Sequence, residues 1–136
     1  MGRNLLAAAD ARALVIDDDA DSRRLIAACL RRLGLQVQEA ATGAETTALL
    51  ARSTPDLICL ELRLPDFDGF ELCERIRAMP RLTDVPILAI TALSRPSDRL
   101  RAHAAGADAL LLKPFRMEAL GEVVRELLAL SSVTAS

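Results

Sequence analysis

The sequence predicts a doubly wound α/β domain built around a parallel sheet. Five short apolar runs alternate with five stretches of helical periodicity, and the connections between them are short. Four of the apolar runs are continuous, as strands covered by helices on both faces must be. The chain has 136 residues, 51% of them hydrophobic, and no linker interrupts it. One domain with a full core is therefore expected.

The first half of the chain supplies two strands and two helices. Residues 12–17 form an apolar run that ends in an acid, and residues 22–33 place apolar side chains at the spacing of one helix face. Residues 35–39 alternate apolar and polar, which is typical of a strand at the edge of a sheet. A capping box at residues 42–45 opens a helix that should run through Arg52.

The second half continues the alternation of strands and helices. In chain order the predicted elements are a strand at 57–62, a helix at 69–79, a strand at 87–90, a helix at 96–105, a strand at 109–112 and a helix at 117–130. Residues 1–10 precede the domain as an extension, and residues 131–136 follow it as a short polar tail. The expected domain therefore covers residues 11–130.

Composition excludes several classes of function. The net charge is −2 with both signs interspersed, and only three aromatic residues are present. Neither a basic patch nor a base-stacking surface for nucleic acid is therefore expected. No apolar run approaches the roughly 20 residues of a membrane span, and the start lacks a secretory signal, which indicates a cytoplasmic protein. Cysteines 29, 59 and 73 show no metal-binding spacing and are interpreted as reduced packing residues.

Polar residues follow four of the five predicted strands at the point where each strand ends. Asp17 and Asp18 close the first strand, Glu61 the third, Thr91 the fourth and Lys113 the fifth. Because the carboxyl ends of parallel strands meet at one edge of the sheet, these side chains should share a site.

The chemistry of this set favours a magnesium and phosphoryl site. Carboxylates gathered at one place repel each other, by on the order of 4 kcal/mol for unit charges about 4 Å apart at an effective dielectric near 20. Lys113 supplies one positive charge, and Mg²⁺ could supply two more in a site made of oxygen ligands. A Thr hydroxyl and a Lys ammonium could then hold the oxygens of a phosphoryl group.

Several short motifs accompany this set of residues. They are Asp17-Asp18 after an apolar run, Leu64-Pro65 followed by Asp68-Gly69, Thr91-Ala92, Gly106-Ala107-Asp108 and Lys113-Pro114-Phe115. With these motifs, residues 11–130 resemble the CheY-like receiver domains of bacterial two-component response regulators. The resemblance implies a flavodoxin-like fold with strand order 2-1-3-4-5 and a signalling role rather than enzymatic activity.

The resemblance also implies roles for the residues of the site. An acid at the end of the third strand accepts a phosphoryl group from a kinase histidine, and here Glu61 matches that position. Thr91 and Lys113 match the residues that contact the phosphoryl oxygens. The Mg²⁺ ligands would be Asp17, Asp18, Glu61 and the backbone carbonyl of Arg63.

Two positions depart from the family pattern. The acceptor in the family is Asp, and Glu61 is one carbon longer, which moves its carboxylate by up to about 1.5 Å. A misplacement of about 1 Å can cost around a hundredfold in rate, so ordinary phosphotransfer is not expected. The longer side chain should instead meet Lys113 and Thr91 and partly imitate the phosphorylated state, with Mg²⁺ bound weakly. Leu110 stands where many receivers carry a switch aromatic.

Alternatives to this hypothesis remain open within signalling. One is a normal phosphorylatable receiver that carries an engineered Asp-to-Glu change, and another is a pseudo-receiver that acts purely as an interaction module. The expected partners are a sensor histidine kinase or another signalling protein, and a homodimer through the last two helices and strand five. Arg95, Arg99 and Arg101 are interpreted as a solvated helix face.

Overall fold

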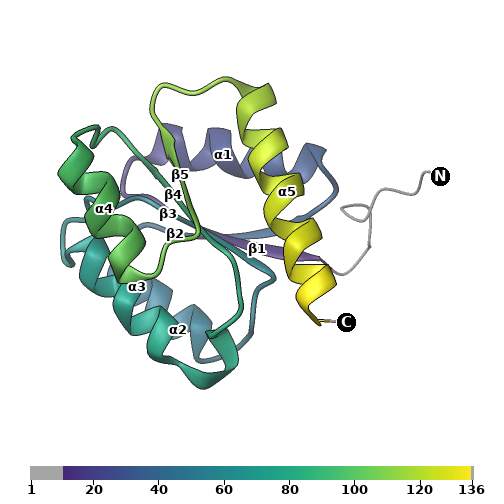
Figure 1. Cartoon of the computed structure of the whole chain (residues 1–136), viewed down its shortest axis with the longest axis horizontal. Helices are drawn as coiled ribbons and strands as arrows, with labels where there is room; N and C mark the ends of the chain where they lie inside the picture. The colour runs from purple at the N-terminus through teal and green to yellow at the C-terminus, as the bar shows by residue number, and fades with distance from the viewer. Residues whose placement is uncertain (1–10, 136) are drawn as a thin grey trace.

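The structure, a computed structural model that describes residues 11–135, is an α/β sandwich of three layers (Figure 1). Its five strands are all parallel and lie in the order β2-β1-β3-β4-β5, which confirms the predicted fold class. The strands are β1 (Arg12–Ile16), β2 (Gln36–Ala40), β3 (Leu57–Leu60), β4 (Ile87–Thr91) and β5 (Ala109–Leu112). The helices are α1 (Ala20–Arg32), α2 (Gly43–Leu50), α3 (Gly69–Ala78), α4 (Pro96–Ala105) and α5 (Met117–Ala135), with a 3₁₀ turn, η2, at Pro80–Leu82.

Side chains that alternate along each strand build a separate core on each face of the sheet. On one face Leu14 and Ile16 of β1 pack with residues of α2, α3 and α4. On the other face Ala13 and Val15 pack with residues of α1 and α5. Figure 1 shows this division, with α1 and α5 on one side of the strands and α2, α3 and α4 on the other. The central strands are therefore buried on both faces, as their continuous apolar sequences predicted. The fourth continuous run, β5, is instead an edge strand, and all of its residues are only half-buried.

Several element boundaries differ from those that the sequence predicted. Helix α1 begins at Ala20 because Asp19, whose side chain accepts a hydrogen bond from the Ser22 backbone N at 3.0 Å, caps it. Strand β3 ends at Leu60, so Glu61 lies just beyond the strand. Helix α2 ends at Leu50, before the predicted end.

The last helix is longer than predicted. Helix α5 continues to Ala135, where a polar tail was expected, since no Gly or Pro follows residue 130 to stop it. The predicted extension, residues 1–10, lies outside the described residues. Among the helices of the described part, none combines the length and apolar character that crossing a bilayer requires.

Candidate functional site

The strand order brings four of the predicted site residues to the carboxyl edge of the sheet. Asp17 and Glu61 directly follow the neighbouring strands β1 and β3, and the backbone N of Glu61 donates to the Ile16 carbonyl at 2.8 Å. Thr91 is the last residue of β4, and Lys113 directly follows β5 and donates its backbone N–H to the Thr91 carbonyl at 2.8 Å. Asp17, Glu61 and Thr91 are buried, at 1%, 8% and 0% exposure.

Lys113 is the centre of this site. Its Nζ lies 2.7 Å from Asp17 Oδ2 and 2.9 Å from Glu61 Oε1, so one ammonium group serves two buried carboxylates. Burial alone would lower the pKa of Lys113, but the hydrogen bonds and charges of Asp17 and Glu61 outweigh it and raise the pKa above the ordinary 10.5. The ammonium form therefore persists throughout the neutral range.

Asp17 is held by further donors from the turn after β1 and from the first turn of α1. Its Oδ1 accepts from the Asp19 backbone N at 3.0 Å, and its Oδ2 accepts from Ser22 Oγ at 2.8 Å. Arg23 donates from Nη1 to the Asp17 carbonyl at 3.0 Å and from Nε to Glu39 of β2 at 3.1 Å. The carboxylate is thus fixed in place, and both of its oxygens already have partners.

Glu61 is equally well bound. Its Oε2 accepts from the backbone N of Leu62 at 2.7 Å and of Arg63 at 3.2 Å, while its Oε1 faces Lys113. The predicted contact with Lys113 is therefore present. The predicted contact with Thr91 is not, because no hydrogen bond joins the two side chains in the described part of the chain. Thr91 Oγ1 accepts instead from the backbone N of Leu93 at 3.3 Å.

The structure does not assemble the predicted magnesium ligands into one site. Asp18 is exposed, and nowhere among residues 11–135 do three His, Cys, Asp or Glu side chains lie in an arrangement that could hold a metal ion. The Arg63 backbone takes part in a bridge to Asp68 within its own loop. A cation that bound Asp17 and Glu61 together would have to displace the Lys113 ammonium. In this arrangement Mg²⁺ would therefore compete with the Lys113 ammonium for the same two carboxylates.

Comparison with known proteins identifies the domain. The family model described as response regulator receiver domain matches residues 13–125. The chain belongs to the response regulator receiver family. Receiver domains interact with histidine kinases and other signalling proteins, and they generally bind Mg²⁺ at the phosphorylation site. The predicted family is therefore confirmed.

Several curated relatives are named as transcriptional regulators. "DNA-binding dual master transcriptional regulator RpaA" of Synechocystis sp. is 42% identical over 117 residues, which cover 86% of this chain and 48% of that protein. "Transcriptional regulatory protein GltR" of Pseudomonas aeruginosa is 38% identical over 121 residues, which cover 89% of this chain and 50% of that protein. The chain thus spans about half the length of these relatives.

Solved receiver structures share the whole fold. A two-component response regulator from Clostridium difficile is 31% identical with a TM-score of 0.82, covering 88% of this chain and 97% of the other. The chemotaxis protein CheY4 of Vibrio cholerae is 29% identical with a TM-score of 0.83, covering 88% and 99%. These matches agree with the observed strand order.

Sequence reasoning missed several residues that shape this receiver's site. Ser22 could have been found from its place in the first helical turn after the acids, where a hydroxyl can reach back to Asp17. Arg101 was interpreted as part of a solvated face. It instead pairs with Asp68, with Nη2 2.8 Å from Oδ2, although both side chains are partly exposed. Arg95 and Arg99 are exposed, as expected.

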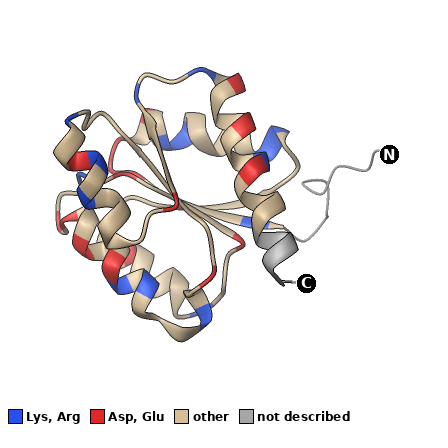
Figure 2. Cartoon of the chain, viewed as in Figure 1, with Lys and Arg blue, Asp and Glu red and all other residues tan. Residues whose placement is uncertain are grey.

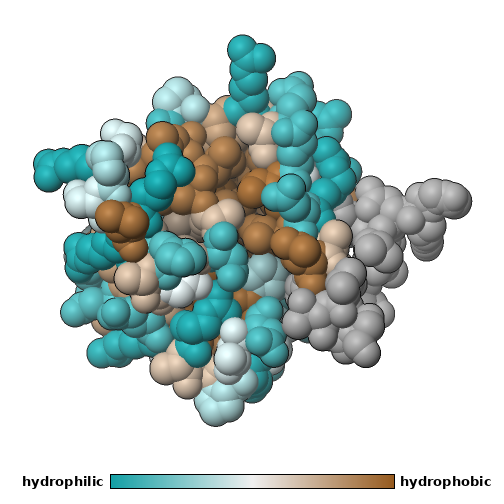
Figure 3. Space-filling model, in the orientation of Figure 1, coloured by the Kyte–Doolittle hydropathy of each residue, from teal (hydrophilic) through white to brown (hydrophobic). Residues whose placement is uncertain are grey.

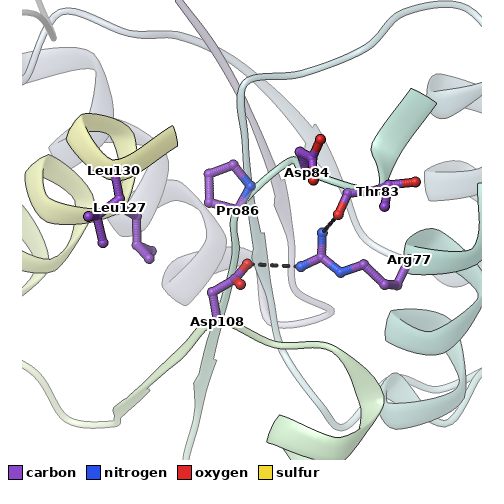
Figure 4. A pocket seen from close by; sticks show the side chains of 7 residues that line it. All are labelled: Arg77, Thr83, Asp84, Pro86, Asp108, Leu127 and Leu130. Atoms are coloured by element: carbon purple, nitrogen blue, oxygen red, sulfur yellow. Dashed lines mark hydrogen bonds and ion pairs between the residues drawn. The ribbon is translucent and has the colours of Figure 1, made fainter. Parts of the chain in front are cut away.

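A pocket at the opposite edge of the receiver's sheet has a structural role. It lies between the ends of α3 and α5 and the starts of β4 and β5 (Figure 4). Arg77 forms its polar wall and donates to the carbonyls of Thr83 and Val85, each at 2.8 Å, to the Gly106 carbonyl and to Asp108. These bonds occupy the guanidinium, which joins the end of α3 to both strand starts.

Proposed function

We propose that this receiver acts without phosphorylation, with Glu61 in the place of the phosphoacceptor and its carboxylate as a partial imitation of a phosphoryl group. The observation that carries the proposal is the 2.9 Å hydrogen bond between Lys113 Nζ and Glu61 Oε1. Lys113 matches the lysine that contacts phosphoryl oxygens in the family. The imitation is partial, since Thr91 bonds to Leu93 and not to Glu61.

The second oxygen of Glu61 supports the same proposal. It accepts from the backbone N of Leu62 and Arg63, so the carboxylate binds a cation on one side and two amide dipoles on the other. A terminal phosphoryl oxygen is suited to the same kinds of donor. The Glu61 carboxylate therefore accepts hydrogen bonds from Lys113 and from two backbone amides. With a shorter Asp at this position, these donors would be left for an incoming phosphoryl group.

Magnesium binding should be weak in this receiver. Lys113 already neutralises Asp17 and Glu61, and Asp18 beside them is exposed to solvent. We expect a dissociation constant on the order of millimolar or weaker. Isothermal titration with MgCl₂ measures it, with Asp18→Ala as the variant that should bind still less. A micromolar constant, or Mg²⁺ binding that Asp18→Ala leaves unchanged, would contradict the assignment.

The face made by α4, β5 and α5 is proposed as the surface that meets partners, including a second copy of the chain. Figure 3 shows apolar surface over β5, between α4 and α5. All four residues of β5 are only half-buried, and Leu100 of α4 is 72% exposed. A histidine kinase or another signalling protein in the cytoplasm is the expected class of partner. Light scattering at rising concentration tests the homodimer.

The proposed function is tested by comparing amide chemical shifts of three forms of the protein. Unmodified Glu61→Asp defines the inactive state, and Glu61→Asp treated with acetyl phosphate and Mg²⁺ defines the phosphorylated state. For residues of α4 and β5, the amide chemical shifts of the unsubstituted protein should lie between those of the two reference states. The shifts of Glu61→Gln should move toward those of the inactive state. Glu71→Asp, a matched change on the exposed surface of α3, should shift nothing at the site.

If the unsubstituted protein had the same amide chemical shifts as unmodified Glu61→Asp, Glu61 would not imitate a phosphoryl group. If Glu61→Gln also changed nothing, the alternative of a plain interaction module would be favoured. Phosphorylation of Glu61 itself by acetyl phosphate would contradict the proposal that this receiver acts without phosphorylation.

A further inference from the structure

The loop that follows Glu61 is closed on itself. Arg63 and Asp68 face each other in an antiparallel bridge, and the Gly69 backbone N donates to the Leu62 carbonyl at 3.0 Å. The two ends of the loop approach so closely that a Cβ on Gly69 would lie 2.4 Å from Leu62 Cα. A displacement at Leu62 or Arg63, the residues whose amides hold the Glu61 carboxylate, therefore reaches Asp68 directly.

Asp68 links this loop to two helices. Its Oδ1 accepts from the Phe70 backbone N at 2.9 Å and caps α3, while its Oδ2 accepts from Arg101 of α4 at 2.8 Å. The Arg101 guanidinium also lies over the Phe70 ring, 4.0 Å from its centroid. A planar guanidinium that stacks on a ring and binds a carboxylate has a defined orientation, so this contact fixes α4 more firmly than a simple surface ion pair would.

The other acid of the loop holds it against α2. Asp66 accepts from the backbone N of Gly43 at 2.8 Å and of Ala44 at 3.1 Å, at the start of that helix. The Gly43 hydrogen bond is the main cause that holds the pKa of Asp66 below its ordinary value. Asp66 binds the start of α2, and Asp68 binds Arg101 of α4. A displacement of the loop should therefore move one of these helices.

We propose that this loop is the route by which the carboxylate of Glu61 sets the position of α4, with the pair formed by Asp68 and Arg101 as the coupling contact. The inference rests on the proposed function, which makes Glu61 the group that defines the state of the domain. At the position of the family's switch aromatic this chain has Leu110, which packs against the core and carries no polar group to read the site. Helix α4 presents Leu100 and Arg99 at the surface, so its position decides what a partner meets.

Amide hydrogen exchange of α4 tests the coupling by a double-mutant cycle. Glu61→Gln keeps the length of the side chain but cannot bind Lys113 and both amides as the carboxylate does. It should speed the exchange of α4 amides by roughly two- to thirtyfold, the range of ordinary coupling energies. In an Arg101→Ala background the same substitution should have no further effect on α4.

Two matched variants make the result specific. Arg99→Ala removes an arginine of the same helix that forms no ion pair within the described residues, and it should leave the full effect of Glu61→Gln in place. Asp68→Asn keeps a good cap for α3 but weakens the contact with Arg101, so it should abolish the effect as Arg101→Ala does. Exchange of the buried β3 amides reports global unfolding in every variant.

The coupling is overturned if Glu61→Gln leaves α4 exchange unchanged, or if its effect survives in both Arg101→Ala and Asp68→Asn. It is also overturned if α4 and β3 amides change by the same factor, because that reports stability alone. None of these outcomes depends on phosphorylation or on a partner. Failure of the coupling and failure of the proposed function are therefore distinguishable.

Discussion

At the scale of single residues, the site depends on how one ammonium group is shared. A unit charge pair about 2.8 Å apart gains on the order of 6 kcal/mol at an effective dielectric near 20, and burying each ion costs several kcal/mol. The net stability from Lys113 with Asp17 and Glu61 is therefore small. The loss on removing Lys113 is not small, because two buried carboxylates would then lack a counter-charge.

The pH dependence of stability should reveal this role of Lys113, which is the only lysine in the chain. Its pKa is raised in the folded protein, so its contribution is complete below the ordinary 10.5 and is lost as pH rises through the folded pKa. Lys113→Met should lower the free energy of unfolding by about 3 kcal/mol at neutral pH, the cost of breaking a buried pair. Urea titrations at several pH values measure both effects.

The control for this prediction is Lys113→Arg, which keeps the charge and should recover part of the lost stability. NMR of the single lysine side chain reports its titration directly. Titration below the ordinary value, or equal stability of Lys113→Met and the unsubstituted protein at neutral pH, would contradict the proposed sharing of the charge.

At the scale of elements, the loop between β3 and α3 is shaped by a close backbone approach. A Cβ on Gly69 would lie 2.4 to 2.6 Å from three backbone atoms of Leu62, so Gly69→Ala must shift the start of α3. We expect a loss of roughly 1–3 kcal/mol, the usual range for overpacking. Thermal unfolding followed by circular dichroism measures it.

Gly121→Ala in α5 is the matched control. The added Cβ would meet only the end of the flexible Arg125 side chain, at 3.3 Å. Removing a helix-interior glycine should therefore stabilise the protein by about 0.5–1 kcal/mol. If both substitutions changed stability in the same direction, the close approach at Gly69 would not control the loop.

At the scale of the whole molecule, packing on both faces of the sheet explains why the cysteines are buried and why their thiols should react slowly. Cys29, Cys59 and Cys73 are free and buried, as the sequence predicted. Burial raises the pKa of the Cys59 thiol to about 12 and of the Cys73 thiol to about 11. Iodoacetamide at pH 8 should therefore modify neither thiol in the folded protein and should modify both in urea. Fast native labelling of Cys59 would contradict the packing of β3.

In the view of Figure 2 acidic and basic residues are both spread over the molecule without a large one-signed face, although the visible side of α5 shows only acidic residues. This agrees with the near-neutral net charge of −2. Association of the receiver with a partner should therefore depend more on local contacts, such as the apolar surface over β5, than on long-range attraction.

The fold and the location of the site could be predicted because both depend on regular features of the chain. Strand-end residues such as Asp17, Glu61 and Lys113 meet wherever parallel strands end together, and the contact of Glu61 with Lys113 follows. The direction of each side chain could not be predicted. Asp18 next to Asp17 turns to solvent, and Thr91 bonds within its own loop, because both depend on rotamers and loop paths that periodicity does not encode.

Contacts between neighbouring helices were equally beyond the sequence. Arg101 finds Asp68 across 33 positions, and only the assembled packing of α3 against α4 brings them together. The start of α3 at Gly69 was predicted, and the cap that Asp68 provides there reaches only two residues along the chain. The sequence thus predicts the groups at the site better than it predicts how the site is connected to the helices.

Intact-mass spectrometry after incubation with acetyl phosphate and Mg²⁺ tests the central claim most directly. If Glu61 takes the place of a phosphoryl group beside Lys113, as proposed, the unsubstituted protein should keep its mass. Glu61→Asp should gain the mass of one phosphoryl group, since Asp17, Thr91 and Lys113 remain in place at the same edge of the sheet. A substantial phosphorylated fraction of the unsubstituted protein, or none in Glu61→Asp, would contradict this account.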